Sequence, residues 1–346
     1  MESRQPDIYV ACSITLFAST AALILRLIAR RTTKFKLWWD DYFAIAAWVF
    51  ATVGTIWVLF WVPLGLGLHL EDVAPLRHEP TNGTISHSLL CLWISDYLYS
   101  FSLGFTKISI LCFYWRIFGH CRTKLGIQTL SVMSVMWICM RLILTTIQCI
   151  PVNAYWDLTI TDKYCPIQSN KFFTGSVITH LFIEFSIIIL PVRKLWQLQL
   201  PTAQKIGIGA VFMSGIFICA TSVVQLVTVL THSASSTDLT WDLAPIIAWG
   251  VVEINLASFA ISLPMLRPIY VVYIRQKPLS AMASHGDHMS RSGRSAIPHR
   301  SADRPRVRDV DEGDSTYELT SDITRSDYEC HIADDKQDGI AKIVVR

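Results

Sequence analysis

Residues 41–66 read DYFAIAAWVFATVGTIWVLFWVPLGL and contain a single charged residue, at the first position. The hydrocarbon core of a bilayer is about 30 Å thick, and an α-helix needs roughly 20 residues to cross it. This stretch is therefore long and apolar enough for a transmembrane helix. Six further stretches share this character: residues 8–28, 88–114, 125–149, 172–192, 206–230 and 242–264. The sequence predicts an all-α membrane protein, a bundle of seven transmembrane helices.

The composition of the chain agrees with this fold class. Hydrophobic residues make up 52% of the sequence and charged residues 16%, whereas a typical soluble domain has roughly 25% charged residues. The first stretch does not resemble a signal peptide, because Glu2, Arg4 and Asp7 precede it where a basic segment would be needed. We therefore retain it as a membrane helix.

Basic residues beside the predicted spans indicate their orientation, because Lys and Arg are retained on the cytoplasmic side. One set of loops carries eleven of them: Arg26, Arg30, Arg31, Lys34, Lys36, Arg116, Arg122, Lys124, Arg193, Lys194 and Lys205. The opposite side carries four: Arg4, Arg77, Lys163 and Lys171. The sequence thus predicts a short extracellular N-terminus, residues 1–7, a seven-helix domain, residues 8–270, and a cytoplasmic tail, residues 271–346.

An N-glycosylation motif, Asn82-Gly83-Thr84, lies on the predicted outer side. Only a loop that faces the secretory lumen would be modified at Asn82. The position of the motif therefore agrees with the orientation given by the basic residues.

The tail after residue 270 is rich in Ser, Asp and Arg, has no helical or strand periodicity, and is predicted to be disordered. Residues 291–308 are basic, and residues 309–338 are acidic. One interpretation is a solvated tail. In the other, the basic half lies on the anionic inner leaflet of the bilayer, while the acidic half is phosphorylated and recruits a cytoplasmic signalling partner.

Three of the nine cysteines lie near the predicted outer surface, where oxidation is permitted. Cys149 and Cys165 bracket the second outer loop, so a disulfide between them would fasten this loop over the end of the bundle. The alternative pair, Cys91 with Cys165, would tie the loop to the third span. The first pairing is favoured because its loop closes locally.

Polar side chains within the predicted spans are costly in lipid and need partners or a function. They are Asp96, Lys107, Arg141, His180, Glu184, Gln225, Glu253 and Asn255. Asp96 and Arg141 lie at a similar depth, roughly 12 Å from the outer ends of their spans, and are candidates for an ion pair. Glu184 and Glu253 lie at roughly 18 Å, and two carboxylates at one depth repel each other unless one is protonated.

These side chains have two interpretations. In the first, they are structural, and their hydrogen bonds and ion pairs fix the register of the helices. In the second, they form a ligand pocket that opens to the outside, with Asp96, Arg141 and His180 near its mouth and Glu184 and Glu253 at its floor.

Several specific chemistries lack support in the sequence. A retinal Schiff base needs a lysine in the last helix, and residues 241–264 contain none. No metal site is predicted, because His180 and Glu184 have no second histidine within the spans. No phosphate-binding loop or zinc-binding cysteine spacing is present, so no cofactor is predicted. Nucleic-acid binding is not indicated either, since the net charge of +3 is divided between loops and tail.

Residues spread over all seven predicted spans have the order and spacing of a known family. They are Arg26, Arg30, Asp40, Asp41, Gly65, Gly67, His69, Lys107, Ser109, Phe113, Tyr114, Arg116, Phe118, Cys149, Pro151, Trp156, Cys165, Pro191, Trp196, Leu198, Trp249, Glu253, Pro264, Arg267 and Pro268. Over about residues 8–270 the chain resembles the fungal rhodopsin-domain integral membrane proteins, a family that includes Pth-type receptor-like proteins and the satratoxin-cluster membrane protein. The chain has Glu184 where that family usually has Asp, and Gln225 where it often has Arg.

The resemblance implies a receptor-like sensor in the plasma membrane or an endomembrane, which binds an external small or lipophilic ligand and does not detect light. The alternative is an accessory membrane protein or intramembrane enzyme of a fungal secondary-metabolite cluster. In that case Glu184 or Glu253 would act as a general acid on a lipophilic intermediate.

Overall fold

The computed structural model describes residues 2–32, 37–77, 81–117, 121–167, 169–195, 202–231 and 238–266. Nearly all of them lie in one compact unit, Met1–Arg116 with Gly126–Pro268. A second unit, Ile117–Leu125 with Ile269–Arg346, is described only at Ile117 and residues 121–125. The predicted disordered tail, residues 271–346, thus lies outside the described residues.

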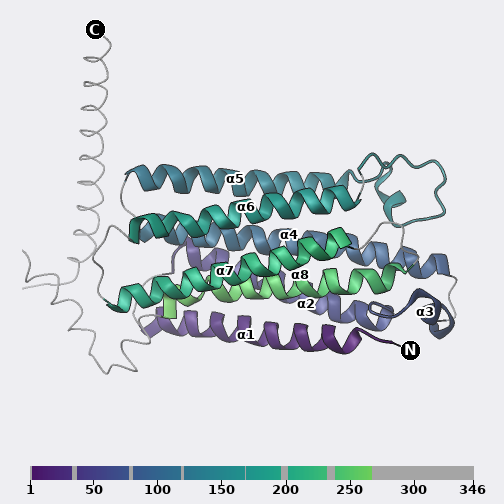
Figure 1. Ribbon diagram of the computed structural model, residues 1–346, viewed down its shortest axis with the longest axis horizontal. Coiled ribbons are helices and arrows are strands. Elements are labelled where there is room, and N and C mark those ends of the chain that lie inside the picture. The colour runs from purple at the N-terminus through teal and green to yellow at the C-terminus, as the bar shows by residue number, and fades with distance from the viewer. Residues whose placement is uncertain are drawn as a thin grey trace, which may run out of the picture. The chain divides into compact units, whose positions relative to one another are not determined.

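Eight α-helices and no β-strand are present in the described ranges. They are α1 (Gln5–Thr32), α2 (Trp39–Trp61), α3 (Leu70–Arg77), α4 (Thr81–Ile117), α5 (Cys121–Thr146), α6 (Ser169–Leu195), α7 (Thr202–Thr231) and α8 (Leu239–Ala260). Short 3-10 turns follow at Val62–Leu64, Val152–Tyr155 and Leu263–Leu266. The predicted all-α class is confirmed, and each predicted span falls largely within one of the seven long helices, which run side by side in Figure 1. The short α3 was not predicted.

Six of the described helices are long and apolar enough to cross a membrane, namely α1, α2, α5, α6, α7 and α8. The exception among the long helices is α4. It extends over 37 residues but carries Asp96 and Lys107 in addition to several Ser and Tyr residues. The chain is therefore a multi-pass membrane protein, and its seventh span and its orientation stay predictions.

Large apolar side chains cover the outside of the bundle, and its interior holds buried polar side chains together with an apolar core. Phe17, Phe182 and Met213 are 78%, 63% and 65% exposed, as suits side chains that face lipid. By contrast, 61% of the most apolar part of α8 is buried, and this helix packs against α1, α2 and α7. The polar side chain of Ser102 on α4 donates to the carbonyl oxygen of Ala47 on α2, so α4 is also held inside the bundle.

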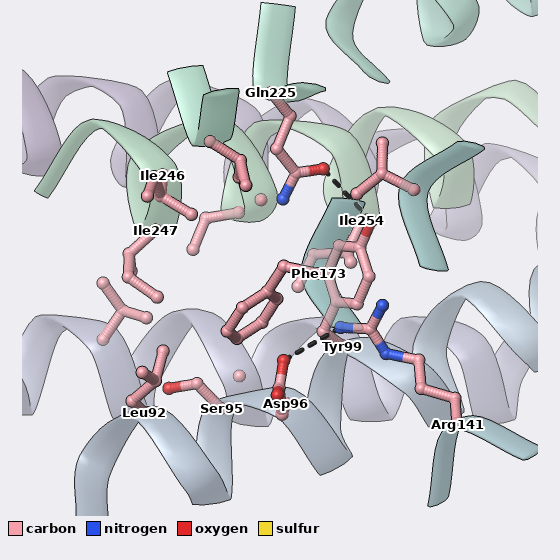
Figure 2. A pocket seen from close by; sticks show the side chains of 16 residues that line it. Leu92, Ser95, Asp96, Tyr99, Arg141, Phe173, Gln225, Ile246, Ile247 and Ile254 are labelled. Carbon is pink, nitrogen blue, oxygen red and sulfur yellow. Dashed lines mark hydrogen bonds and ion pairs between the residues drawn. The ribbon is translucent and has the colours of Figure 1, made fainter. Parts of the chain in front are cut away.

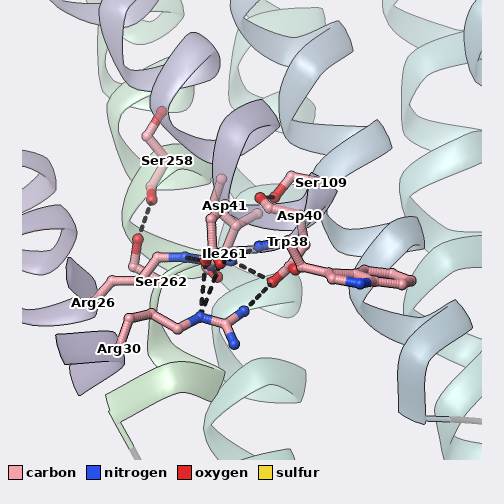
Figure 3. Close-up of polar contacts among 9 residues, drawn as sticks. All are labelled: Arg26, Arg30, Trp38, Asp40, Asp41, Ser109, Ser258, Ile261 and Ser262. Atoms are coloured by element: carbon pink, nitrogen blue, oxygen red, sulfur yellow. Dashed lines mark hydrogen bonds and ion pairs between the residues drawn. The ribbon is translucent and has the colours of Figure 1, made fainter. Parts of the chain in front are cut away.

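The start of α2 is fixed by a buried cluster of two arginines and two aspartates (Figure 3). Arg26 contacts Asp40 at 2.7 Å and Asp41 at 2.9 Å, and Arg30 contacts the same two carboxylates at 2.9 Å each. The Arg26 guanidinium also donates to the carbonyl oxygen of Ile261 after α8. The acidic pair complements the positive end of the α2 dipole, and the cluster fastens α1 to α2 and α8.

A loop closed by a disulfide follows α5. Cys149 and Cys165 are bonded, which leaves no place for the alternative pairing of Cys165 with Cys91. Backbone hydrogen bonds between Ile150 and Tyr164 close the base of the same loop. Within the loop, hydrogen bonds from the Thr159 hydroxyl and backbone N–H lower the pKa of Asp157.

The glycosylation motif is predicted to lie in a loop, but in the structure it lies in the first turn of α4. Asn82 is exposed there, whereas Thr84 is buried. The helix begins earlier than the apolar pattern suggests, because the first residues of α4 are polar and give no apolar signal.

Candidate functional site

Buried polar side chains in the bundle form three layers. The first layer joins α4 to α5 and α6 through Arg141. Its Nη2 lies 2.9 Å from Asp96 Oδ1, its Nε donates to Ser100 Oγ at 2.7 Å, and its Nη1 donates to Ser176 Oγ at 2.5 Å. The guanidinium also lies 4.8 Å from the centre of the Tyr99 ring. The sequence favours this ion pair of Asp96 and Arg141, and the structure contains it.

The second layer surrounds Glu253 on α8, which is fully buried. Tyr99 on α4 donates its hydroxyl to Glu253 Oε2 at 2.7 Å, and Ser222 on α7 donates to Glu253 Oε1. His180 Nε2 on α6 lies 3.1 Å from Glu253 Oε1, as an ion-pair contact whose angles fall outside those of a hydrogen bond. One carboxylate thus connects four helices.

The third layer is the pair of Lys107 on α4 and Glu184 on α6, in which the ammonium donates to Glu184 Oε1. Lys107 is 1% exposed, and its Nζ lies 5.6 Å from the centre of the Trp137 ring. An ammonium above an aromatic face is attracted to the ring electrons, so Trp137 helps to hold this charge away from water.

The three layers follow one face of α6. Ser176, His180 and Glu184 are spaced four residues apart, so they lie one above another with a rise of roughly 6 Å between them. Each of these residues contacts one layer. Trp137 on α5 contacts each of the three layers. Its Nε1 donates to the carbonyl oxygen of Ser176, its ring centre lies 5.5 Å from that of His180, and the Lys107 Nζ lies 5.6 Å from its ring centre.

A cavity of about 50 Å³ lies beside the first layer. Its polar side is formed by Ser95, Asp96, Tyr99, Arg141 and Gln225. The rest of the wall is apolar and comes mainly from α2 and α8. Figure 2 shows the polar group on α4 and α5 on one side, with isoleucines of α8 across the space. We call this space the first cavity.

A second cavity, also of about 50 Å³, lies beside the third layer. Lys107 and Glu184 line it together with apolar residues of α6, α7 and α8, such as Ile187, Phe212 and Ala260. The second layer lies between the two cavities along α6, because Val177 lines the first cavity, Glu184 lines the second, and His180 lies between these two positions.

The five residues predicted for one pocket are thus distributed differently in the structure. Asp96 and Arg141 line the first cavity, Glu184 lines the second, and His180 and Glu253 lie between them. The expected repulsion between Glu184 and Glu253 does not arise, since each carboxylate has a basic partner of its own.

Sequence reasoning missed the hydroxyl groups that complete the layers, Ser100, Ser176, Ser222 and Tyr99. Serine and tyrosine are common in membrane helices and do not stand out by type. A usable signal was their spacing: Ser100 lies one helical turn after Asp96, and Ser176 one turn before His180.

Comparison with known protein families identifies the family of this chain. A model of the fungal rhodopsin domain matches residues 25–272. The chain belongs to this family. The resemblance inferred from single residues is therefore confirmed, and the fungal rhodopsin domain covers all three layers and both cavities. No solved structure matches the chain.

Three relatives of this fungal rhodopsin-domain protein carry informative names. A fugralins biosynthesis cluster protein 2 of Gibberella zeae is 27% identical over 49% of this chain and 44% of its own. A SAT4 family membrane protein of Emericella nidulans is 30% identical over 54% and 47%. A wortmanamides biosynthesis cluster protein C of Talaromyces wortmannii is 25% identical over 76% and 70%. The chain spans about half the length of the first two relatives.

Proposed function

We propose that this protein crosses the membrane seven times, with its N-terminus outside. In this proposal α4 is a span in addition to the six helices that are long and apolar enough to cross a membrane. The side chains of α4 support this, because Asp96, Tyr99 and Lys107 each reach a partner on another helix. The polar character that lowers the hydropathy of α4 is thus turned toward the bundle rather than toward lipid. The excess of basic residues in the loops supports the orientation.

The protein acts as a receptor-like sensor whose ligand binds in the first cavity. The observation that carries this proposal is the composition of that cavity, a largely apolar wall with one polar side at Asp96, Tyr99, Arg141 and Gln225. Such a wall suits a small lipophilic molecule with one or two polar groups, which fix its orientation. Because the cavity is lined by six helices, binding can change their mutual positions.

Signal transfer in this proposal uses the second layer. Tyr99 lines the first cavity and also donates to Glu253, so a ligand that competes for the Tyr99 hydroxyl weakens a contact shared by four helices. The ends of these helices then move against one another on the cytoplasmic side, where loops and tail meet a signalling partner.

A binding experiment tests the ligand site. The full chain in lipid nanodiscs is screened by thermal unfolding against a panel of lipophilic metabolites. We expect at least one compound to raise the unfolding temperature of the wild type, and the Gly250→Leu variant to lose this response. Gly250 lines the first cavity, and a Cβ there already lies 3.4 Å from Gln225 Nε2, so a leucine fills the space.

Gly175→Leu is the matched control. Gly175 is also helical, and a Cβ at this position has no neighbour within 4 Å. This variant should respond to the compound as the wild type does. If Gly250→Leu and Gly175→Leu both respond as the wild type does, the ligand does not bind in the first cavity. If no compound of the panel raises the unfolding temperature of the wild type, the result argues against the sensor.

A role in a biosynthetic pathway is the second candidate, favoured by the two relatives that are named as cluster proteins. In this case Glu184, which lines the second cavity, serves as the acid or binding group. Deletion of the gene and profiling of metabolites distinguish the two candidates. An accumulated precursor that a Glu184→Gln allele also produces favours the pathway role, whereas an unchanged profile contradicts it.

A further inference from the structure

The three polar layers contain acids and bases that the binding of a ligand in the first cavity does not require. Ionisable side chains at membrane depth are costly, and chains of Asp, Glu and His at such depth are typical of proton pathways. Here they follow one face of α6 over two helical turns, from Ser176 to Glu184, which is roughly 12 Å. A cavity lies at each end of this series.

The connection from the first cavity to the centre is direct. Tyr99 lines the cavity, and its hydroxyl lies 2.7 Å from Glu253 Oε2. The other oxygen of Glu253 accepts from Ser222 and lies 3.1 Å from His180 Nε2. A proton can pass along the hydrogen bond from Tyr99 to Glu253, and a rotation of the His180 ring, without any movement of the helices, aligns its Nε2 with Glu253 for the next transfer.

His180 has the arrangement of a proton shuttle. It is 1% exposed, its Nε2 faces Glu253, and its Nδ1 has no hydrogen-bond partner among the described residues. A buried polar nitrogen without a partner costs free energy, so this position needs an explanation. An imidazole can accept a proton on one nitrogen and release another proton from the second.

The step from His180 to the second cavity follows α6. Glu184 lies one turn beyond His180 on the same face and lines that cavity with Lys107. Cys219 on α7 lies within electrostatic range of both Glu253 and Glu184, so the second and third layers are near one another. On the α5 side, the buried Trp137 ring contacts both His180 and Lys107.

Each cavity is large enough for water. At about 10–15 Å³ per molecule, a cavity of about 50 Å³ holds roughly three to five water molecules. Polar groups needed to hold them are present on both sides, Asp96 and Ser95 in the first cavity and Lys107 and Glu184 in the second. Water can thus deliver a proton at one end and remove it at the other.

We infer that this bundle conducts protons between its two cavities through Tyr99, Glu253, His180 and Glu184. Water in the first cavity gives a proton to the Tyr99 oxygen while the Tyr99 proton moves to Glu253 Oε2. The Glu253 carboxyl rotates about its Cγ–Cδ bond and passes the proton from the side of Oε1 to His180 Nε2. The His180 ring then turns so that Nδ1, which has no hydrogen-bond partner in the part of the chain that the structure describes, approaches Glu184 one helical turn away and releases its proton to that carboxylate, which gives it to water in the second cavity. One proton is transferred in total, and no electron is.

Polar and charged groups of neighbouring helices surround the centre of the path. Glu253 faces Tyr99 from α4, Ser222 from α7 and His180 from α6, while Arg141 and Lys107 lie against the same Trp137 ring as His180.

A flux experiment tests the inference. The full chain is reconstituted in liposomes that contain a pH-sensitive dye, and a potassium diffusion potential drives protons inward without added ligand. We expect faster acidification than in protein-free liposomes. Replacement of the central groups by Glu253→Gln or His180→Gln should lower the flux about a hundredfold, the lower range of what a positioned proton carrier contributes.

Three further variants keep the result interpretable. Tyr99→Phe removes only a hydroxyl group and should also abolish the flux, so it serves if the glutamine variants do not fold. Glu184→Asp keeps a carboxylate and should retain flux. Ser19→Ala removes a buried hydrogen bond to Asn255 outside the path and should leave the flux unchanged.

The inference is overturned if the wild type conducts no faster than empty liposomes. It is also overturned if Tyr99→Phe, Glu253→Gln and His180→Gln all conduct as the wild type does. The flux is measured without ligand, so its absence does not bear on ligand binding in the first cavity. A failed binding screen likewise leaves the flux result unaffected.

Discussion

Arg141 shows how single residues make a charged group tolerable at this depth. Its guanidinium gives one hydrogen bond to a carboxylate and two to serine hydroxyls, and it lies beside the Tyr99 ring. Lys107 has an equivalent combination of one carboxylate, Glu184, and one aromatic ring, Trp137. Each buried charge therefore depends on a specific partner on another helix.

A change of one partner should be more damaging than a change of both. Arg141→Met leaves Asp96 buried without its cation, and we expect a loss of about 3–5 kcal/mol in unfolding free energy. The double variant Asp96→Asn with Arg141→Met removes both charges and should recover part of this loss. Thermal unfolding in detergent measures the difference, and Lys163→Gln in an exposed loop serves as the control. A double variant less stable than Arg141→Met would contradict this account.

The sequence predicted the ion pair of Asp96 and Arg141 because both residues are rare in spans and lie at equal depth. It did not predict the partner of Glu253. Depth alone brought Glu253 next to Glu184, whereas the structure places His180 and Tyr99 around it. Such contacts depend on how each helix is rotated about its own axis, and the seven apolar stretches do not determine this rotation.

At the scale of elements, the apolar pattern predicted the long helices and missed what joins them. The eight residues of α3 include Pro75, Glu71, Asp72 and Arg77, and they give no sustained apolar period. α3 follows a sharp turn of the chain at the end of α2. Gly65 ends the turn Val62–Leu64 with φ of 118°, a conformation that favours glycine.

Gly65 should therefore tolerate no side chain. A Cβ at this position would lie 2.7 Å from Val73 Cγ1 of α3, in addition to the unfavourable backbone conformation. We expect Gly65→Ala to cost about 1–3 kcal/mol of stability. The matched change, Gly175→Ala, meets no neighbour within 4 Å and should not destabilise the protein. Thermal unfolding of both variants gives the comparison, and equal values would show that the turn adapts.

At the scale of the whole molecule, composition was sufficient to predict the class. Apolar side chains cover the outside of the bundle, which is unlike the surface of a soluble protein, while the interior combines an apolar core with buried polar side chains. The division into two cavities could not be predicted, since it depends on contacts between residues far apart in sequence. Tyr99 and Glu253, for example, are separated by 154 positions.

The orientation of the bundle is open to a direct test. The excess of basic residues on one set of loops predicts that Asn82 lies outside and that residues 271–346 lie in the cytoplasm. We expect the expressed protein to lose mass on treatment with an N-glycosidase, and Asn82→Gln to abolish this shift. Asn82 is exposed in the first turn of α4, and glycan transfer precedes folding, so the buried Thr84 does not prevent it. An acceptor motif engineered into residues 271–346 should stay unmodified. Glycan on that motif, with none on Asn82, would require the opposite orientation and would place the first cavity at the cytoplasmic side of the membrane.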